Sequence, residues 1–243
     1  MLAARLGAAL LVGPVIGSFV TNWSLRRVRG EQAVTGRSRC EHCGRELDFL
    51  RTLPIVAYAT LRGRCDRCRA AIDPIHLGGE IGGALVVAFA LGGAWPWEPA
   101  ARALLGFSLL ALTIIDLRTL RLPDALTALA AVACAWLGVL RGAIVEGLAA
   151  AVILALVLAL LRRLTRRGTT PGLGLGDVKL AAALALWLGL SSSWMLALAA
   201  FIGLGWFSLA RPANGKLPFG PSLAAAALII GGLRDLDLWS ALP

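Results

Sequence analysis

Two aspartates stand at the ends of apolar runs, where a chain that crosses a membrane tolerates charge least. Asp116 closes a run that ends in Ile114-Ile115, and Asp177 opens another run directly after Gly176. An ionisable group inside a membrane segment is costly, and it usually marks a functional site. Two carboxyl groups that share a proton can act as general base and general acid on a peptide carbonyl. These residues predict an intramembrane aspartyl enzyme.

The composition predicts that the elements carrying these acids are membrane helices. Of the 243 residues, 58% are hydrophobic and 16% are charged, which is too apolar for one soluble core. A spanning helix needs about 20 mostly apolar residues. Runs near that length predict an all-α polytopic membrane protein with about eight transmembrane helices, at residues 6–25, 75–95, 100–116, 124–140, 143–161, 177–191, 194–210 and 219–234.

The basic residues predict the orientation of these helices. Arg26, Arg27 and Arg29 outweigh Arg5 around the first run, so we expect the N-terminus outside and residues 26–74 in the cytoplasm. Alternate crossing then puts most of the 24 lysines and arginines on the cytoplasmic side, and both aspartates near that face. The net charge of +10 therefore reflects topology, and we expect no nucleic-acid partner.

Four cysteines in the predicted cytoplasmic loop have the spacing of a metal site. Cys40, Cys43, Cys65 and Cys68 form the pattern C-x2-C-x21-C-x2-C. Four thiolates at such spacing suit structural zinc in tetrahedral coordination. Two disulfides are the alternative, which a reducing cytoplasm disfavours. We expect zinc, because a loop of this length without a large apolar core needs a metal or a covalent cross-link to order it.

Glycines precede Asp177, and a second glycine motif opens the last predicted helix. Gly172, Gly174 and Gly176 alternate before the acid, and they would allow a substrate strand to approach the backbone closely. A flexible loop is the alternative for these glycines, and a simple turn is the alternative for the later motif, Pro218-Phe219-Gly220-Pro221.

Glu80 is an acid within a predicted span. It lies in Gly78-Gly79-Glu80-Ile81-Gly82-Gly83, where two overlapping G-x-x-x-G pairs favour close helix packing. A buried acid there is a functional candidate, and a loop arginine is the alternative partner for it.

Several of these motifs together resemble a known family. In chain order they are Gly17-Ser18-Phe19, the two cysteine pairs, Asp116 with Leu122-Pro123-Asp124, Gly174 to Leu180 including Lys179, and Pro218-Phe219-Gly220-Pro221. Their order over nearly the whole chain is similar to that of the type IV prepilin peptidases, the leader peptidases of bacterial pili and type II secretion systems. The resemblance implies a multi-pass protein of the bacterial inner membrane.

The resemblance also implies an activity and site residues. Asp116 and Asp177 would be the catalytic pair that cuts the short basic leader of prepilins or pseudopilins after a glycine, at the cytoplasmic face. Gly174, Gly176 and Lys179 would shape the site or bind substrate, together with Pro218, Phe219, Gly220 and Pro221. Relatives with the cysteine loop often also methylate the new N-terminus with S-adenosylmethionine.

The sequence predicts three parts and leaves other function classes open. Residues 1–25 form the first transmembrane helix, 26–74 the four-cysteine zinc loop and 75–243 the transmembrane peptidase core. The loop has 11 arginines and six acids, so we expect it to bind anionic membrane lipids rather than a basic leader. An ion-coupled transporter that uses the two aspartates, or an assembly factor without catalysis that docks through the zinc loop, are the alternatives.

Overall fold

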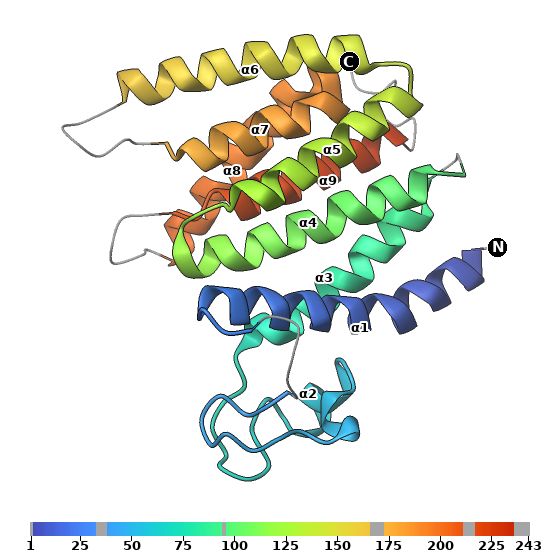
Figure 1. Ribbon diagram of the computed structural model, residues 1–243, viewed down its shortest axis with the longest axis vertical. Helices are drawn as coiled ribbons and strands as arrows, with labels where there is room; N and C mark the ends of the chain where they lie inside the picture. The colour runs from blue at the N-terminus through green and yellow to red at the C-terminus, as the bar shows by residue number, and fades with distance from the viewer. Residues whose placement is uncertain (1, 33–37, 94–95, 166–172, 211–216, 236–243) are drawn as a thin grey trace. The chain divides into compact units, whose positions relative to one another are not determined.

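The computed structural model describes residues 2–32, 38–93, 96–165, 173–210 and 217–235. In these ranges the regular secondary structure is helical, apart from two isolated β-bridges in the cysteine loop. Eight helices of 14 or more residues follow the predicted runs (Figure 1): α1 (Leu2–Val28), α3 (Pro74–Leu91), α4 (Glu98–Thr119), α5 (Asp124–Leu140), α6 (Ile144–Leu164), α7 (Leu175–Leu188), α8 (Ser192–Ala210) and α9 (Gly220–Asp235). Three shorter elements are η1 (Phe49–Thr52), α2 (Val56–Thr60) and η2 (Gly189–Ser191).

The structure supports a multi-pass membrane protein. Five helical segments among the described residues are long and apolar enough to cross a bilayer. One of them runs continuously from Leu175 to Leu209 through α7, η2 and α8. Exposed apolar side chains recur along α6 from Val145 to Leu164, as expected for a face in contact with lipid. The count of eight spans stays a prediction.

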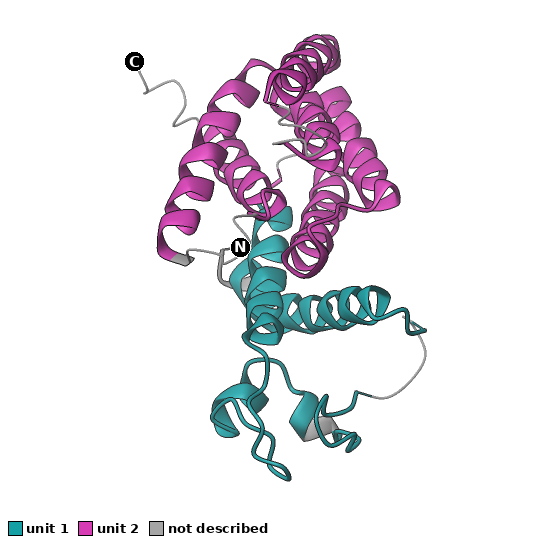
Figure 2. Cartoon of the chain, turned by 90° about the vertical axis from the view of Figure 1, so that its left-hand side faces the viewer, with its two compact units in different colours: residues 1–92 teal, residues 93–243 magenta. Residues whose placement is uncertain are grey.

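The chain divides into two compact units, Met1–Gly92 and Gly93–Pro243 (Figure 2). The first unit contains α1, α3 and the cysteine loop, and the second contains α4 to α9. Because α3 packs on α1, it belongs to the compact unit of the cysteine loop. The three-part division predicted from the sequence concerns topology, and it stays a prediction.

In the first unit, glycines bring α1 and α3 into backbone contact. A Cβ on Gly83 would lie 2.6 Å from the Cα of Gly17, and a Cβ on Gly13 would lie 2.8 Å from the backbone nitrogen of Ala84. Two helices can approach this closely only where neither has a side chain at the crossing. Of the two G-x-x-x-G pairs predicted to pack closely, Gly79 and Gly83 do so against α1, whereas Gly78 of the other pair faces open space.

In the second unit, helices α4, α5, α7 and α6 lie in that order, as Figure 1 shows. Helix α9 packs against α4, α7 and α8. The core between these helices consists of small and aliphatic side chains, with Trp187 its largest fully buried residue. Small residues let membrane helices approach closely, so van der Waals contacts can stabilise the bundle in lipid, where no hydrophobic effect acts between helices.

A buried ion cluster joins three helices of the second unit. Arg102 contacts Glu98 at 2.6 Å and Asp235 at 2.8 Å, and Arg141 contacts the same two acids at 2.9 and 2.6 Å. Glu98 and Arg102 lie at the start of α4, Arg141 caps α5, and Asp235 ends α9. Two arginines and two acids balance in charge, so the cluster ties these helix ends together without a net buried charge.

Candidate active site and metal centre

Four helix ends meet at one end of the second unit, opposite the end that holds the buried ion cluster around Arg102 and Arg141. Helix α4 ends there, and α5, α7 and α9 begin there. Leu120 ends α4 in the left-handed conformation, with φ 53°, and its N–H bonds the carbonyl of Asp116. The short link to α5 then reverses the chain. Three helix N-termini, which carry partial positive charge, thereby surround the end of α4.

Asp116 lies in the last turn of α4 and is 4% exposed. Its Oδ2 atom accepts a hydrogen bond of 2.9 Å from the backbone N–H of Gly220, the first residue of α9. That N–H has no partner inside its own helix, so the carboxylate satisfies a donor that would otherwise be unpaired. Asp116 is thereby fixed to the start of α9.

Asp177 lies half-buried in the first turn of α7. Its carboxylate lies beside the backbone of Gly174, the N-cap residue, and the charge of Asp116 acts on it. The structure therefore brings the two acids into electrostatic range within one unit. Each lies beside the backbone at the start of a helix.

The predicted glycines serve close approach rather than unusual backbone angles. Gly174 is extended, with φ −66°, and a Cβ there would lie 2.7 Å from Oδ2 of Asp177. A Cβ on Gly176 would lie 2.9 Å from Cβ of Leu122. A larger residue at Gly174 would displace the Asp177 carboxylate, and one at Gly176 would push the start of α7 away from Leu122. Gly172 lies outside the described residues.

Leu122, to which the sequence motifs assign no role, also belongs to this site. Its side chain lies against Gly176, and it would also meet a Cβ on Gly220 at 3.1 Å. It therefore fills the space between the starts of α7 and α9. In the sequence it is marked by the motif Leu122-Pro123-Asp124, which follows α4 directly.

The remaining predicted site residues take different places. Pro218 and Phe219 precede α9, and Pro221 is its second residue, where a fixed φ suits a helix start. The motif thus opens the last helix and also delivers the Gly220 N–H to Asp116. Lys179 is exposed and contacts Asp124 at 2.7 Å, so it pairs with α5 rather than with either predicted catalytic acid.

The side chain of Asp124 does not cap α5, because Pro123 holds the N-cap position and no side chain caps there. Asp124 is the first helical residue, and its carboxylate bonds Lys179 instead.

In the first unit, the four predicted cysteines converge. Their sulfur atoms all lie within 4.8 Å of one another, and Cys40 Sγ and Cys68 Sγ are 3.8 Å apart. Thiolates at about 2.3 Å from a tetrahedral zinc ion would stand about 3.8 Å apart. All four are free cysteines, so the disulfide alternative does not describe this structure.

The two cysteine pairs have the same local fold. Cys40 N–H bonds the carbonyl of Arg45, and Cys65 N–H bonds that of Ala70, both at 2.9 Å. Asp66 of the second pair contacts Arg45 of the first at 3.0 Å and Arg51 at 2.8 Å. These ion pairs hold the two turns together around the sulfur atoms.

The cysteine cluster is chemically suited to a metal. The backbone N–H groups of Cys68 and Arg67 hold the pKa of Cys65 at about 7, below the ordinary thiol value. The thiolate form is the form that binds zinc. The sulfur positions, the spacing and the lowered pKa of Cys65 fit a zinc site with four cysteine ligands.

Comparisons with known proteins agree with the division into two units. Residues 11–92 match the bacterial peptidase A24 N-terminal domain, and residues 103–209 match the type IV leader peptidase family. No solved structure shows significant similarity to the chain.

Curated relatives carry one name. The chain is 35% identical over 210 residues to the prepilin leader peptidase/N-methyltransferase of Aeromonas hydrophila, covering 79% of this chain and 70% of that protein. The protein of the same name from Burkholderia pseudomallei is 35% identical, and the match covers 78% of this chain and 64% of the relative. The Neisseria gonorrhoeae protein is 33% identical, with 84% and 73% covered. On these matches, the chain belongs to the type IV leader peptidase family.

Proposed function

We propose that this chain is a membrane-embedded aspartic endopeptidase that removes the short basic leader from type IV prepilins or type II secretion pseudopilins. The observation that supports it most is the Asp116–Asp177 pair, which lies at one end of a helical bundle with each acid beside a helix start. The relatives named leader peptidase supply the substrate class. This membership favours a peptidase over an ion-coupled transporter or an assembly factor without catalysis.

The proposed chemistry uses the two carboxyl groups as one unit. An ionised carboxylate takes a proton from a water molecule, whose oxygen attacks the scissile carbonyl carbon. The protonated partner donates to the carbonyl oxygen, and the proton then reaches the leaving amine as the C–N bond breaks. The proton count is restored in each cycle because the pair shares one proton. The Gly220 N–H fixes the direction in which Asp116 presents its second oxygen.

The location of this chemistry follows from the predicted topology. The arginines near residues 26–69 put the cysteine loop and the Asp116 end of α4 on the cytoplasmic side of a bacterial inner membrane. Leaders that emerge from the ribosome would therefore meet the site before export. The zinc ion would be structural, held by Cys40, Cys43, Cys65 and Cys68, with no position left open for substrate.

A second activity, N-methylation of the new N-terminus, is supported by the name of the relatives and by a cavity in the first unit. The lone pair of the neutral amine would form the new N–C bond as the C–S bond of S-adenosylmethionine breaks. The bonding pair stays on sulfur, which becomes a neutral thioether, and the methylated amine then loses a proton to water.

Mass spectrometry of a prepilin incubated with the purified full-length protein tests both activities. Loss of the leader at its terminal glycine is the expected result, with one added methyl group when S-adenosylmethionine is present. An intact prepilin would contradict the peptidase. A cleaved but unmethylated product would contradict only the methyltransferase.

A further inference from the structure

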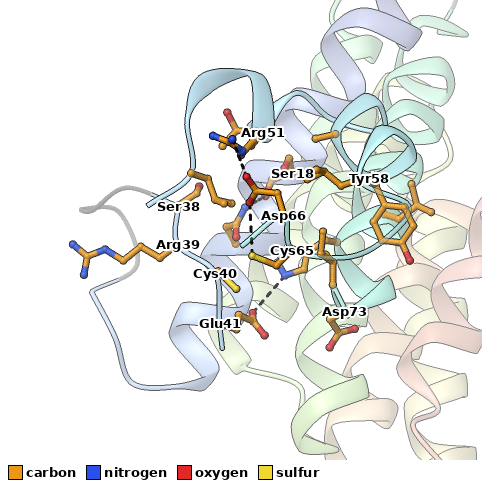
Figure 3. A pocket seen from close by; sticks show the side chains of 18 of the residues that line it. Ser18, Ser38, Arg39, Cys40, Glu41, Arg51, Tyr58, Cys65, Asp66 and Asp73 are labelled. Carbon is orange, nitrogen blue, oxygen red and sulfur yellow. Dashed lines mark hydrogen bonds and ion pairs between the residues drawn. The ribbon is translucent and has the colours of Figure 1, made fainter. Parts of the chain in front are cut away.

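The first unit contains a cavity of about 140 Å³ between the cysteine loop and helices α1 and α3 (Figure 3). Its walls combine apolar side chains with a larger number of polar and charged ones. The apolar part includes Leu47, Leu53, Leu61, Ile72 and Leu77. Four acids also line it: Glu41, Asp66, Asp73 and Glu80.

Three of these acids already have an evident role within the protein. Arg29 and His76 contact Glu41, and Arg45 and Arg51 contact Asp66. Asp73 caps α3 by accepting the N–H of Ile75 at 3.0 Å. The cavity arginines also have partners, since Arg51 faces Asp66 and Arg39 pairs with Glu46. Figure 3 shows Arg39 turned outward.

Glu80 is the exception. It is 8% exposed, and its two oxygens accept hydrogen bonds from Ser18 Oγ at 3.1 Å and from the backbone N–H of Ile55 at 2.6 Å. Both donors are neutral, and across the described ranges no Lys, Arg or His nitrogen lies within ion-pair distance of Glu80. The loop arginine considered as its partner is therefore not found there.

A buried carboxylate without a cation is costly, so a site that retains one is suited to a positively charged ligand. The backbone that holds this acid in position is also strained. Ile55, its donor, has φ 63°, which is strained for a β-branched residue. The close glycine crossing of α1 and α3 brings Ser18 beside Glu80.

We propose that this cavity is the methyl-donor site and that Glu80 faces the sulfonium of S-adenosylmethionine. The inference rests on the proposed methylation and is independent of leader cleavage. The amine that accepts the methyl group must be neutral, so a carboxylate that stabilised its ammonium form would oppose the reaction. The sulfonium carries a fixed charge, which makes it the better partner. Methyl transfer removes that charge, so the neutral product S-adenosylhomocysteine would bind more weakly and leave.

Equilibrium binding to the purified full-length protein in detergent tests this assignment. We expect S-adenosylmethionine to bind about tenfold tighter than S-adenosylhomocysteine, because only the former carries a positive charge on its sulfur atom for Glu80 to face. Sinefungin, which carries an ammonium group near the sulfonium position, should share the tighter binding. Equal affinity for all three compounds, or no binding of any, would overturn the proposal.

Two variants assign the charge preference to a residue. Glu80→Gln should bring the affinity ratio close to one. Asp73→Asn removes an equal charge from the same cavity while keeping a capping side chain, and it should leave the ratio unchanged. Zinc content and leader cleavage by each variant report folding. A ratio that follows Asp73, or that survives Glu80→Gln, would refute the role of Glu80 even if the protein methylates its product.

Discussion

The backbone N–H of Gly220 donates a 2.9 Å hydrogen bond to Oδ2 of Asp116 across 104 residues of sequence. This bond joins the last turn of α4 to the first residue of α9. A glycine is needed there for space, since a Cβ would lie 2.8 Å from the same oxygen. The start of α9 therefore sets where Asp116 lies, and a change of one methyl group at Gly220 should be felt at the acid.

Gly220→Ala should lower leader cleavage by at least about tenfold, or about 1.4 kcal/mol of barrier, because the new methyl group displaces Asp116 or α9. Cleavage rates of a prepilin in detergent would measure the effect. Gly232→Ala is the matched control in the same helix, since a Cβ there meets nothing within 4 Å. Equal rates for the two variants would show that the Gly220 contact is unimportant.

The packing of α1 on α3 can be tested with a similar pair. Gly83→Ala would drive a methyl group into the backbone of Gly17, so we expect a lower melting temperature of the purified protein. Gly78→Ala, in the same helix, faces open space and should be neutral or stabilising by up to about 1 kcal/mol. Thermal unfolding curves that coincide for the two variants would contradict the close crossing.

The ion cluster of the second unit should contribute to stability. Glu98→Gln leaves Arg102 and Arg141 with Asp235 as their shared acid in this cluster, and we expect a loss of about 3 kcal/mol in the free energy of unfolding. The control is Asp124→Asn, which breaks the exposed pair with Lys179 and should cost less than about 1 kcal/mol. Denaturation of both variants in the same detergent provides the comparison. A Glu98→Gln protein as stable as the control would show that the buried pairs carry little of the fold.

Metal analysis tests the cysteine site. Purified protein should contain about one zinc ion per chain, and Cys40→Ser should lose most of it because a tetrahedral thiolate site needs all four ligands. Cys134→Ala, which alters a buried cysteine of α5 away from the cluster, should keep its zinc. Wild-type protein without metal would contradict the zinc site.

Much of this architecture could be predicted because membrane helices are evident from local composition. All eight predicted runs lie on helices, and the paired cysteines converge as their spacing indicated. Tertiary relationships could not be predicted in the same way. The local sequence around Arg102 and Arg141 does not indicate a buried ion cluster, because helix packing brings the acids Glu98 and Asp235 to them.

The site shows the same division between local signal and tertiary contact. The motif around Gly220 could be recognised as a helix start, but no local pattern shows that its N–H reaches Asp116. The glycines before Asp177 suggested room for a substrate strand, whereas Gly174 and Gly176 make room for the side chains of Asp177 and Leu122. Such contacts depend on which helix ends meet, and this is decided by packing over the whole unit.

Mass spectrometry of a prepilin exposed to single Asn variants tests whether Asp116 and Asp177 together cleave the leader. A neutral amide cannot exchange a proton with its partner, so Asp116→Asn and Asp177→Asn should each reduce cleavage by about two to four orders of magnitude while the protein still inserts and binds zinc. Asp124→Asn, which changes a nearby exposed acid, should cleave at close to the wild-type rate. Substantial leader removal by either of the first two variants would contradict the aspartyl mechanism.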